Sequence, residues 1–212
     1  MHRRRSIRLK DYNYSQAGAY FVTVCTWERK CMFGRIVEGV MQLNPPGSIV
    51  QDCWNDLRHH FPDAEFEVFV VMPNHFHGIV VIKTDIVGAI HELPLHENKL
   101  ARRRMLLPKI IGRFKMISAK RMNEVRGTPG VPVWQRNYYE HVIRDEKSFG
   151  RIQEYIQTNV LRWEMDKENP SFKGVDEFDY WMISIKKPPT GLKRLDKVIE
   201  RFPSTGVRPN AE

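Results

Sequence analysis

Two histidines, His75 and His77, are separated by one residue inside a stretch rich in β-branched and aromatic residues, 66–82. Residues i and i+2 of a strand point to the same face, so the two imidazoles are predicted to converge on one point above a sheet. Paired metal ligands need this arrangement. The neighbouring residues are apolar, so both rings need polar partners. The spacing indicates a metal site, with structural histidines as the alternative.

The elements that must position these histidines follow from local patterns. Residues 66–72 and 76–82 have strand composition, and only Pro73, Asn74 and His75 separate them, which predicts a tight antiparallel hairpin. Other elements are predicted in chain order as a strand at 19–26, a loop through Pro45 to Gly47, a helix at 48–61, a helix at 108–125, a strand at 133–143 and a helix at 145–161. The first of the predicted helices, 48–61, carries Ser48 and Gln51 at the spacing of a capping box.

The helix at 145–161 has an apolar stripe flanked by two polar side chains. Tyr155 lies beside the stripe, and Asn159 lies one helical turn beyond it on the same flank. A tyrosine in this position commonly serves only packing.

Regular patterns are absent from 83–107, which we expect to be a loop or insertion. After residue 162 we expect 178–185 to cover the core and 186–212 to be a charged tail with a short helix at 192–202.

Composition limits the class of protein. The chain has 212 residues, 42% hydrophobic and 28% charged, which suits one domain with an appendage. The net charge of +9 predicts a polyanionic partner such as nucleic acid. No apolar run approaches the roughly 20 residues of a membrane span, so we expect a cytoplasmic protein. The three cysteines contain no C-x-x-C pair and indicate neither a disulfide framework nor a zinc ribbon.

Basic residues gather in three places that are candidates for DNA binding, although solvated charge is the alternative for each. One is an N-terminal arm, 1–14, another is an arginine run in the irregular segment, and the third is one side of the helix at 108–125. The residues are Arg3, Arg4, Arg5, Arg8, Arg102, Arg103, Arg104, Lys109, Arg113 and Lys120.

Four separated motifs resemble the single-tyrosine HUH transposases, and within them the REP-associated tyrosine transposases. They are RRRSIRLKDYNYSQAGAYFVTVCT at 3–26, VVMPNHFHGIV at 70–80, VWQRNYYEHVIRD at 133–145 and YIQTN at 155–159. The order of elements is that of a ferredoxin-like α+β fold. We therefore expect an antiparallel sheet with helices packed on one face, a catalytic domain at 1–165 and a partly irregular C-terminal extension at 166–212.

The resemblance implies a role for each matching residue. His75 and His77 match the HUH metal ligands, Tyr155 the nucleophile and Asn159 a polar third ligand, for Mg²⁺ or Mn²⁺. The implied enzyme is a DNA transposase, an endonuclease that cuts and rejoins single-stranded DNA at palindromic hairpins through a 5′-phosphotyrosine. Its partner would be such a hairpin, and its state a monomer or homodimer.

Several alternatives remain open. Tyr138 and Tyr139 are rival nucleophiles that point to opposite faces of a strand, so at most one faces the histidines. His141 is by default a core residue, with a ligand or general acid as alternatives. The remaining histidines, His59, His60, His91 and His96, are expected at the surface. Rival functions are a catalytically silent palindrome-binding protein derived from a transposase, an RNA-binding module, and a phosphodiesterase that uses water and would survive Tyr155→Phe.

Overall fold

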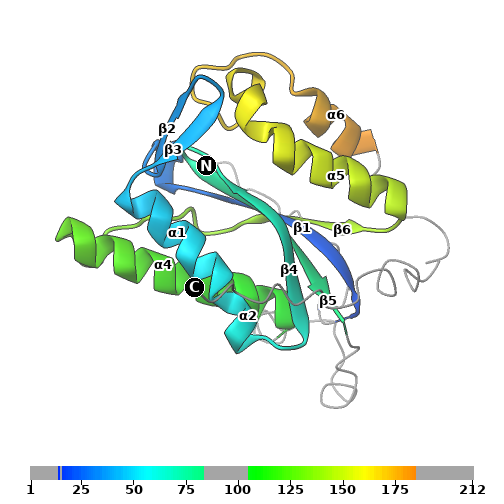
Figure 1. The fold of residues 1–212 in the computed structure, drawn as a ribbon, viewed down its shortest axis with the longest axis horizontal. Coiled ribbons are helices and arrows are strands. Elements are labelled where there is room, and N and C mark those ends of the chain that lie inside the picture. The colour runs from blue at the N-terminus through cyan, green and yellow to red at the C-terminus, as the bar shows by residue number, and fades with distance from the viewer. Residues whose placement is uncertain (1–13, 15, 84–104, 185–212) are drawn as a thin grey trace, which may run out of the picture.

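Four antiparallel strands form the central sheet of the computed structural model, which describes Tyr14 and residues 16–83 and 105–184 (Figure 1). The strands are β1 (Gly18–Cys25), β4 (Ala64–Val71), β5 (His75–Ile82) and β6 (Tyr139–Ile143), in the spatial order β4-β5-β1-β6. One helical connection lies between β1 and β4 and another between β5 and β6, which is the ferredoxin-like order. The predicted α+β class, the first strand and the histidine-bearing hairpin are confirmed.

Two helices cover one face of this sheet. They are α1 (Pro45–Asn55), followed by the short α2 (Leu57–His60), and α4 (Leu106–Arg126), which is close to the helix predicted at 108–125. Side chains of Tyr20, Val22 and Val24 on β1 join them in one hydrophobic cluster. Trp54 of α1 is fully buried there, with its ring centroid 4.5 Å from that of Phe76.

The start of α1 differs from the prediction. The helix begins at Pro45 rather than Ser48, and the side chain of Asn44, not Ser48, accepts the hydrogen bond from the Gly47 N–H at 3.0 Å. Proline is suited to the first turn of a helix because its missing N–H has no intrahelical partner there. The Pro45–Gly47 segment is therefore helix and not loop.

The opposite face of the sheet is covered as well, by α5 (Glu146–Thr158), the 3₁₀ helix η2 (Asn159–Met165) and α6 (Glu177–Ser184) (Figure 1). The prediction that the helices pack on one face is wrong. Phe21, Ile79 and Val81 project to this second face, and leaving them in water would be unfavourable. Every residue of β5 is buried, as expected for a strand covered on both faces.

A small hairpin precedes α1 where no strand was predicted. It consists of β2 (Gly34–Val37) and β3 (Val40–Leu43), after the short 3₁₀ helix η1 (Trp27–Arg29). Glu38 and Gly39 connect the two strands with φ angles of 50° and 75°. A two-residue hairpin turn with positive φ at both positions usually contains Asn-Gly or Asp-Gly, so Glu-Gly is a weak sequence signal.

Other expectations are met in part. The strand predicted at 133–143 is regular only from Tyr139, while Trp134 forms an isolated bridge with Thr26. The helix predicted at 145–161 is α5 followed by η2. Phe178 and Met182 of α6 are buried, which confirms that this segment covers the core. No helix within the described residues is long and apolar enough to span a bilayer.

Several predictions lie outside the described residues. These are the basic arm at 1–13, the segment 84–104 with its arginine run, the histidines His91 and His96, and the tail from 185 onward with its expected helix. The domain division at residue 165 stays a prediction.

Gly78 on β5 allows α1 to approach the sheet, which gives a test of this packing. A Cβ atom added there would lie 2.7 Å from the Trp54 ring. We expect Gly78→Ala to lower the free energy of unfolding by about 1–3 kcal/mol because the core would be overpacked. Urea unfolding measures the change. The matched control is Gly112→Ala on α4, where nothing lies within 4 Å of the added Cβ, and which should stabilise by about 0.5–1 kcal/mol. Equal effects of both substitutions would contradict this packing.

Candidate active site

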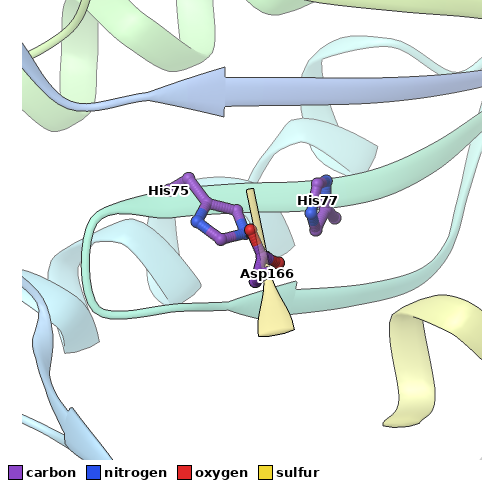
Figure 2. Close-up of side chains that lie close together, drawn as sticks. All are labelled: His75, His77 and Asp166. Carbon is purple, nitrogen blue, oxygen red and sulfur yellow. Dashed lines mark ion pairs between the residues drawn. The ribbon is translucent and has the colours of Figure 1, made fainter. Parts of the chain in front are cut away.

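His75 and His77 are the first and third residues of β5 and point to the face that α5 covers (Figure 2). Both side chains are fully buried, and their ring centroids are 4.5 Å apart. The convergence predicted from their spacing is confirmed.

The inner nitrogen of each imidazole is held by a polar neighbour. Nδ1 of His77 lies 2.8 Å from Oγ1 of Thr23, its cross-strand partner on β1. Nδ1 of His75 lies 2.9 Å from Oδ1 of Asn74. The Asn74 amide group donates to the carbonyl oxygens of Arg29 and Glu168, which fixes Oδ1 as the atom facing His75. His75 therefore donates its Nδ1–H, and its Nε2 carries the lone pair that a metal ion requires.

Helix α5 brings Tyr155 to these histidines. Asp145 caps the helix by accepting the Ser148 N–H at 2.8 Å, and the apolar stripe of α5 packs on the sheet. The Tyr155 hydroxyl then lies 3.5 Å from Nε2 of His77, and only 5% of the residue is exposed. The structure thus places the expected nucleophile beside the expected ligands.

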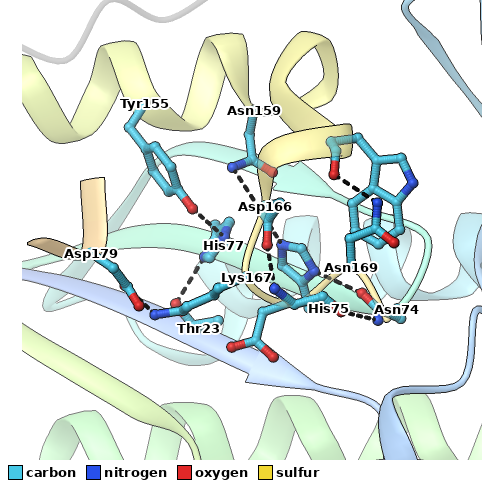
Figure 3. A network of polar contacts seen from close by, with 12 residues as sticks. Thr23, Asn74, His75, His77, Tyr155, Asn159, Asp166, Lys167, Asn169 and Asp179 are labelled. Atoms are coloured by element: carbon cyan, nitrogen blue, oxygen red, sulfur yellow. Dashed lines mark hydrogen bonds and ion pairs between the residues drawn. The ribbon is translucent and has the colours of Figure 1, made fainter. Parts of the chain in front are cut away.

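Asp166 is the site residue that the sequence reasoning missed. One of its carboxylate oxygens lies 3.7 Å from Nε2 of His75, and the ligand atoms of His75, His77 and Asp166 all lie within 4.8 Å of one another (Figure 2). Asn159 donates from Nδ2 to Asp166 at 3.1 Å (Figure 3). Asp166 follows a 3₁₀ helix in a segment without hydrophobic period, so the sequence contains no positional signal for it.

The donor set fits a divalent cation. Nε2 of His75 and Oδ1 of Asn159 are buried without a hydrogen-bond partner among the described residues. Leaving buried polar atoms unpaired is costly, and a cation bound between them would satisfy both. Two imidazoles with carboxylate and amide oxygens form a mixed N/O group suited to Mn²⁺ or Mg²⁺. Asn159 remains a predicted ligand, and Asp166 becomes a second oxygen candidate.

Burial sets the protonation states of this group. Burial lowers the pKa of His75 to about 3, although the Glu168 carboxylate acts in the opposite direction. Burial, with His75 close by, also holds the pKa of His77 well below its usual value. Both imidazoles are therefore neutral at pH 7 and able to bind a metal ion.

The same burial acts on the phenol. It raises the pKa of Tyr155 well above 10, and the carboxylates of Asp166 and Asp176 raise it further. Tyr155 is therefore protonated at neutral pH. It needs an added positive charge before it can act as a phenolate.

The two rival tyrosines, Tyr138 and Tyr139, lie on opposite faces of the sheet. Tyr139 pairs with Thr23 and lies on the histidine face, whereas Tyr138 packs against the cluster on the opposite face. Burial, followed by the effect of Asp179, raises the pKa of Tyr139. His141 is buried on β6 opposite Phe21, as expected for a core residue. Tyr155, whose hydroxyl contacts His77, remains the better candidate.

The basic residues of α4 do not lie at this site. Lys109, Arg113 and Lys120 belong to a helix of the opposite layer, across the sheet from Tyr155 (Figure 1). Arg113 contacts the exposed His60 at 2.9 Å, and Lys120 lies 3.9 Å from Glu124. The surface positions expected for His59 and His60 are confirmed.

Comparison with known proteins finds one relative by sequence. No family model matches it. A protein of Haemophilus influenzae, described as uncharacterized, is 43% identical over 173 residues, which are 79% of this chain and 93% of that protein. The two proteins belong to one family.

Two solved structures also match. A REP-associated tyrosine transposase bound to a REP hairpin has a TM-score of 0.44 and 19% identity, with 79% of this chain and 77% of that chain covered. A protein of Deinococcus radiodurans described as a candidate transposase has a TM-score of 0.39 and 18% identity, with 71% and 96% covered.

The neutral buried histidines predict how stability depends on pH. The folded protein keeps both imidazoles uncharged, whereas in the unfolded chain they bind protons below pH 6.5. The contribution of these two histidines to the free energy of unfolding is therefore fully present above about pH 6.5 and is lost as the pH falls below it. Between pH 7 and 5.5 we expect a loss of about 1 kcal/mol for each histidine. Urea unfolding in EDTA measures it. His77→Gln should reduce this pH dependence, and an unchanged slope in that variant would contradict the assignment.

The oxygen ligands give a second prediction. Asn159→Ala and Asp166→Ala should each weaken Mn²⁺ binding about 10–100-fold because each removes a group that binds or orients a ligand. Titration calorimetry with Mn²⁺ measures this directly. Tyr155→Phe serves as the control and should bind Mn²⁺ as the unmodified protein does. Unchanged affinity in both alanine variants would show that only the histidines hold the ion.

Proposed function

We propose that this protein is a tyrosine transposase of the REP-associated type, which cleaves and rejoins single-stranded DNA at palindromic hairpins. The observation that supports this most directly is the 3.5 Å approach of the Tyr155 hydroxyl to Nε2 of His77, within the buried His75–His77–Asp166 group. Residues 77 and 155 lie in separate sequence motifs, and their meeting is what a tyrosine transesterase requires. The hairpin substrate follows from the motif resemblance.

The proposed reaction is a transesterification, in which a phosphoryl group passes from a 3′-oxygen of the DNA to Tyr155. The Tyr155 oxygen attacks the scissile phosphorus, the bond from phosphorus to the 3′-oxygen breaks, and a 5′-phosphotyrosine forms. The tyrosine loses its proton and the departing 3′-oxygen gains one. Because the phosphotyrosine ester conserves the bond energy, a second 3′-hydroxyl can reverse the step and join strands.

The side chains of this chain have distinct roles. His75 and His77, with Asn159 and Asp166, would hold a divalent cation, which supplies charge neutralisation at the phosphate and favours the phenolate. Thr23 and Asn74 orient the imidazoles. The ring of Phe21 packs edge-on against Tyr155 and would limit the access of water, which would otherwise compete as a nucleophile.

The basic residues of α4 have a supporting role in this proposal. Lys109, Arg113 and Lys120 lie across the sheet from Tyr155, so they would contact the hairpin backbone away from the scissile phosphate. Such contacts contribute affinity without sequence information.

A covalent-adduct assay tests the proposed activity. We expect a labelled single-stranded REP-type hairpin with Mn²⁺ or Mg²⁺ to give a protein–DNA band that persists on a denaturing gel. Tyr155→Phe should reduce the adduct by about 10³-fold or more because the attacking atom is removed. EDTA should abolish it equally. Tyr139→Phe, which removes the neighbouring hydroxyl on the same face, should retain the adduct.

The other outcomes identify the rival functions. Cleavage that continues in Tyr155→Phe would indicate a phosphodiesterase that uses water. Tight, metal-independent binding of hairpins without adduct or cleavage would favour the catalytically silent palindrome-binding protein.

A further inference from the structure

Lys167 is a basic residue of the histidine site to which the proposed reaction assigns no role. It directly follows Asp166, in a segment tied to the hairpin that carries the histidines. Its carbonyl oxygen accepts from Arg29 at 3.3 Å, and the next residue, Glu168, accepts at its carbonyl oxygen from Asn74 at 2.7 Å. The backbone of Lys167 is thereby fixed relative to His75.

The ammonium group of Lys167 faces the site. Its Nζ lies 5.5 Å from the centroid of the Tyr139 ring, on the histidine face of the sheet. After burial, its charge is among the causes that lower the pKa values of both His75 and His77. The side chain is about one third exposed, at 32%, so solvent and ligands can reach it.

An acidic residue of α6 currently pairs with this lysine. Lys167 donates from Nζ to the Asp179 carboxylate (Figure 3). In the same helix, Phe178 lies flat on the Tyr155 ring, with centroids 3.5 Å apart and an interplanar angle of 4°. Helix α6 thus presents an aromatic ring to Tyr155 and an adjacent anion to Lys167.

A flat ring next to an anion is also what a nucleotide presents. Proteins hold unpaired bases by stacking them on aromatic side chains, and lysine binds phosphate as a point charge. Tyr155 is only 5% exposed, and Phe178 covers one face of its ring, so displacement of α6 would open space for a strand beside Tyr155. The strand and α6 then need the same space.

We propose that Lys167 binds a backbone phosphate of the single strand beside Tyr155, in exchange for the Asp179 carboxylate, while a base takes the place of the Phe178 ring. This subsite rests on the proposed function for its ligand, single-stranded DNA. Among the described residues, Arg29 also acts on His75. Its Nε lies 3.0 Å from the carboxylate of Glu168, whose backbone is tied to Asn74. The carboxylate that pairs with Lys167 belongs instead to α6 and would leave with it, so Lys167 is the better phosphate ligand.

Two substitutions with opposite expected effects test the exchange. Lys167→Gln should weaken binding of a fluorescein-labelled single-stranded oligonucleotide about 10-fold because one phosphate contact is lost. Asp179→Asn should strengthen binding by a similar factor because the competing carboxylate is removed. The double variant should bind as weakly as Lys167→Gln. Fluorescence anisotropy in EDTA measures all three affinities in the full chain, without dependence on cleavage.

Matched controls separate this local exchange from general charge. Lys173→Gln removes one positive charge from an exposed position, and Glu177→Gln removes one negative charge from the exposed side of α6. Each should change affinity less than about 2-fold. In the adduct assay with Mn²⁺, Asp179→Asn should form adduct faster and Lys167→Gln more slowly, in the same proportion as binding.

The outcomes also distinguish this proposal from the proposed function. If the unmodified protein forms adduct but Lys167→Gln and Asp179→Asn change affinity no more than the controls, the subsite is wrong and the transesterase stands. If no adduct forms with any hairpin or metal, but the two variants shift affinity in opposite directions, the subsite is supported and the chemistry is wrong. Equal weakening by both variants would show that their ion pair is only structural and would overturn the exchange.

Discussion

The structure depends on the burial of two imidazoles in a sheet that is covered on both faces. His75 and His77 are shielded from water, so neither binds a second proton at neutral pH, and each ring nitrogen needs a partner. Thr23 and Asn74 supply partners for the inner nitrogens. Nε2 of His75 faces Asp166, and Nε2 of His77 faces the Tyr155 hydroxyl. Because burial keeps both imidazoles neutral, their lone pairs and the Asp166 carboxylate are available to a divalent cation.

The two faces of the sheet differ in the kind of side chains that cover them. On one face, α1 and α4 form a dry aromatic core in which Gly78 permits close contact with Trp54. On the other face, α5 and the segment after it combine an apolar stripe with the polar group around the histidines. The second layer thus contributes both hydrophobic burial and the residues of the candidate site.

Tyr155 is held in a position that favours its neutral form. Its ring is covered by Phe178, its hydroxyl is near His77, and the nearby carboxylates oppose ionisation. A phenol in this environment is unreactive until positive charge and a phosphate arrive together. In the proposed reaction, this arrangement would couple the activation of Tyr155 to the presence of substrate.

Sequence alone determined the features that depend on local spacing: the histidine pair on one face of a strand, the hairpin that carries it, and the helix that places Tyr155 one turn before Asn159. Tertiary structure decided the rest. Asp166 and Lys167 follow a 3₁₀ helix with no hydrophobic period, and only the folding of that segment against Asn74 brings them to the histidines. The second helical layer was also missed, because a strand buried on both faces has the same apolar composition whichever elements cover it.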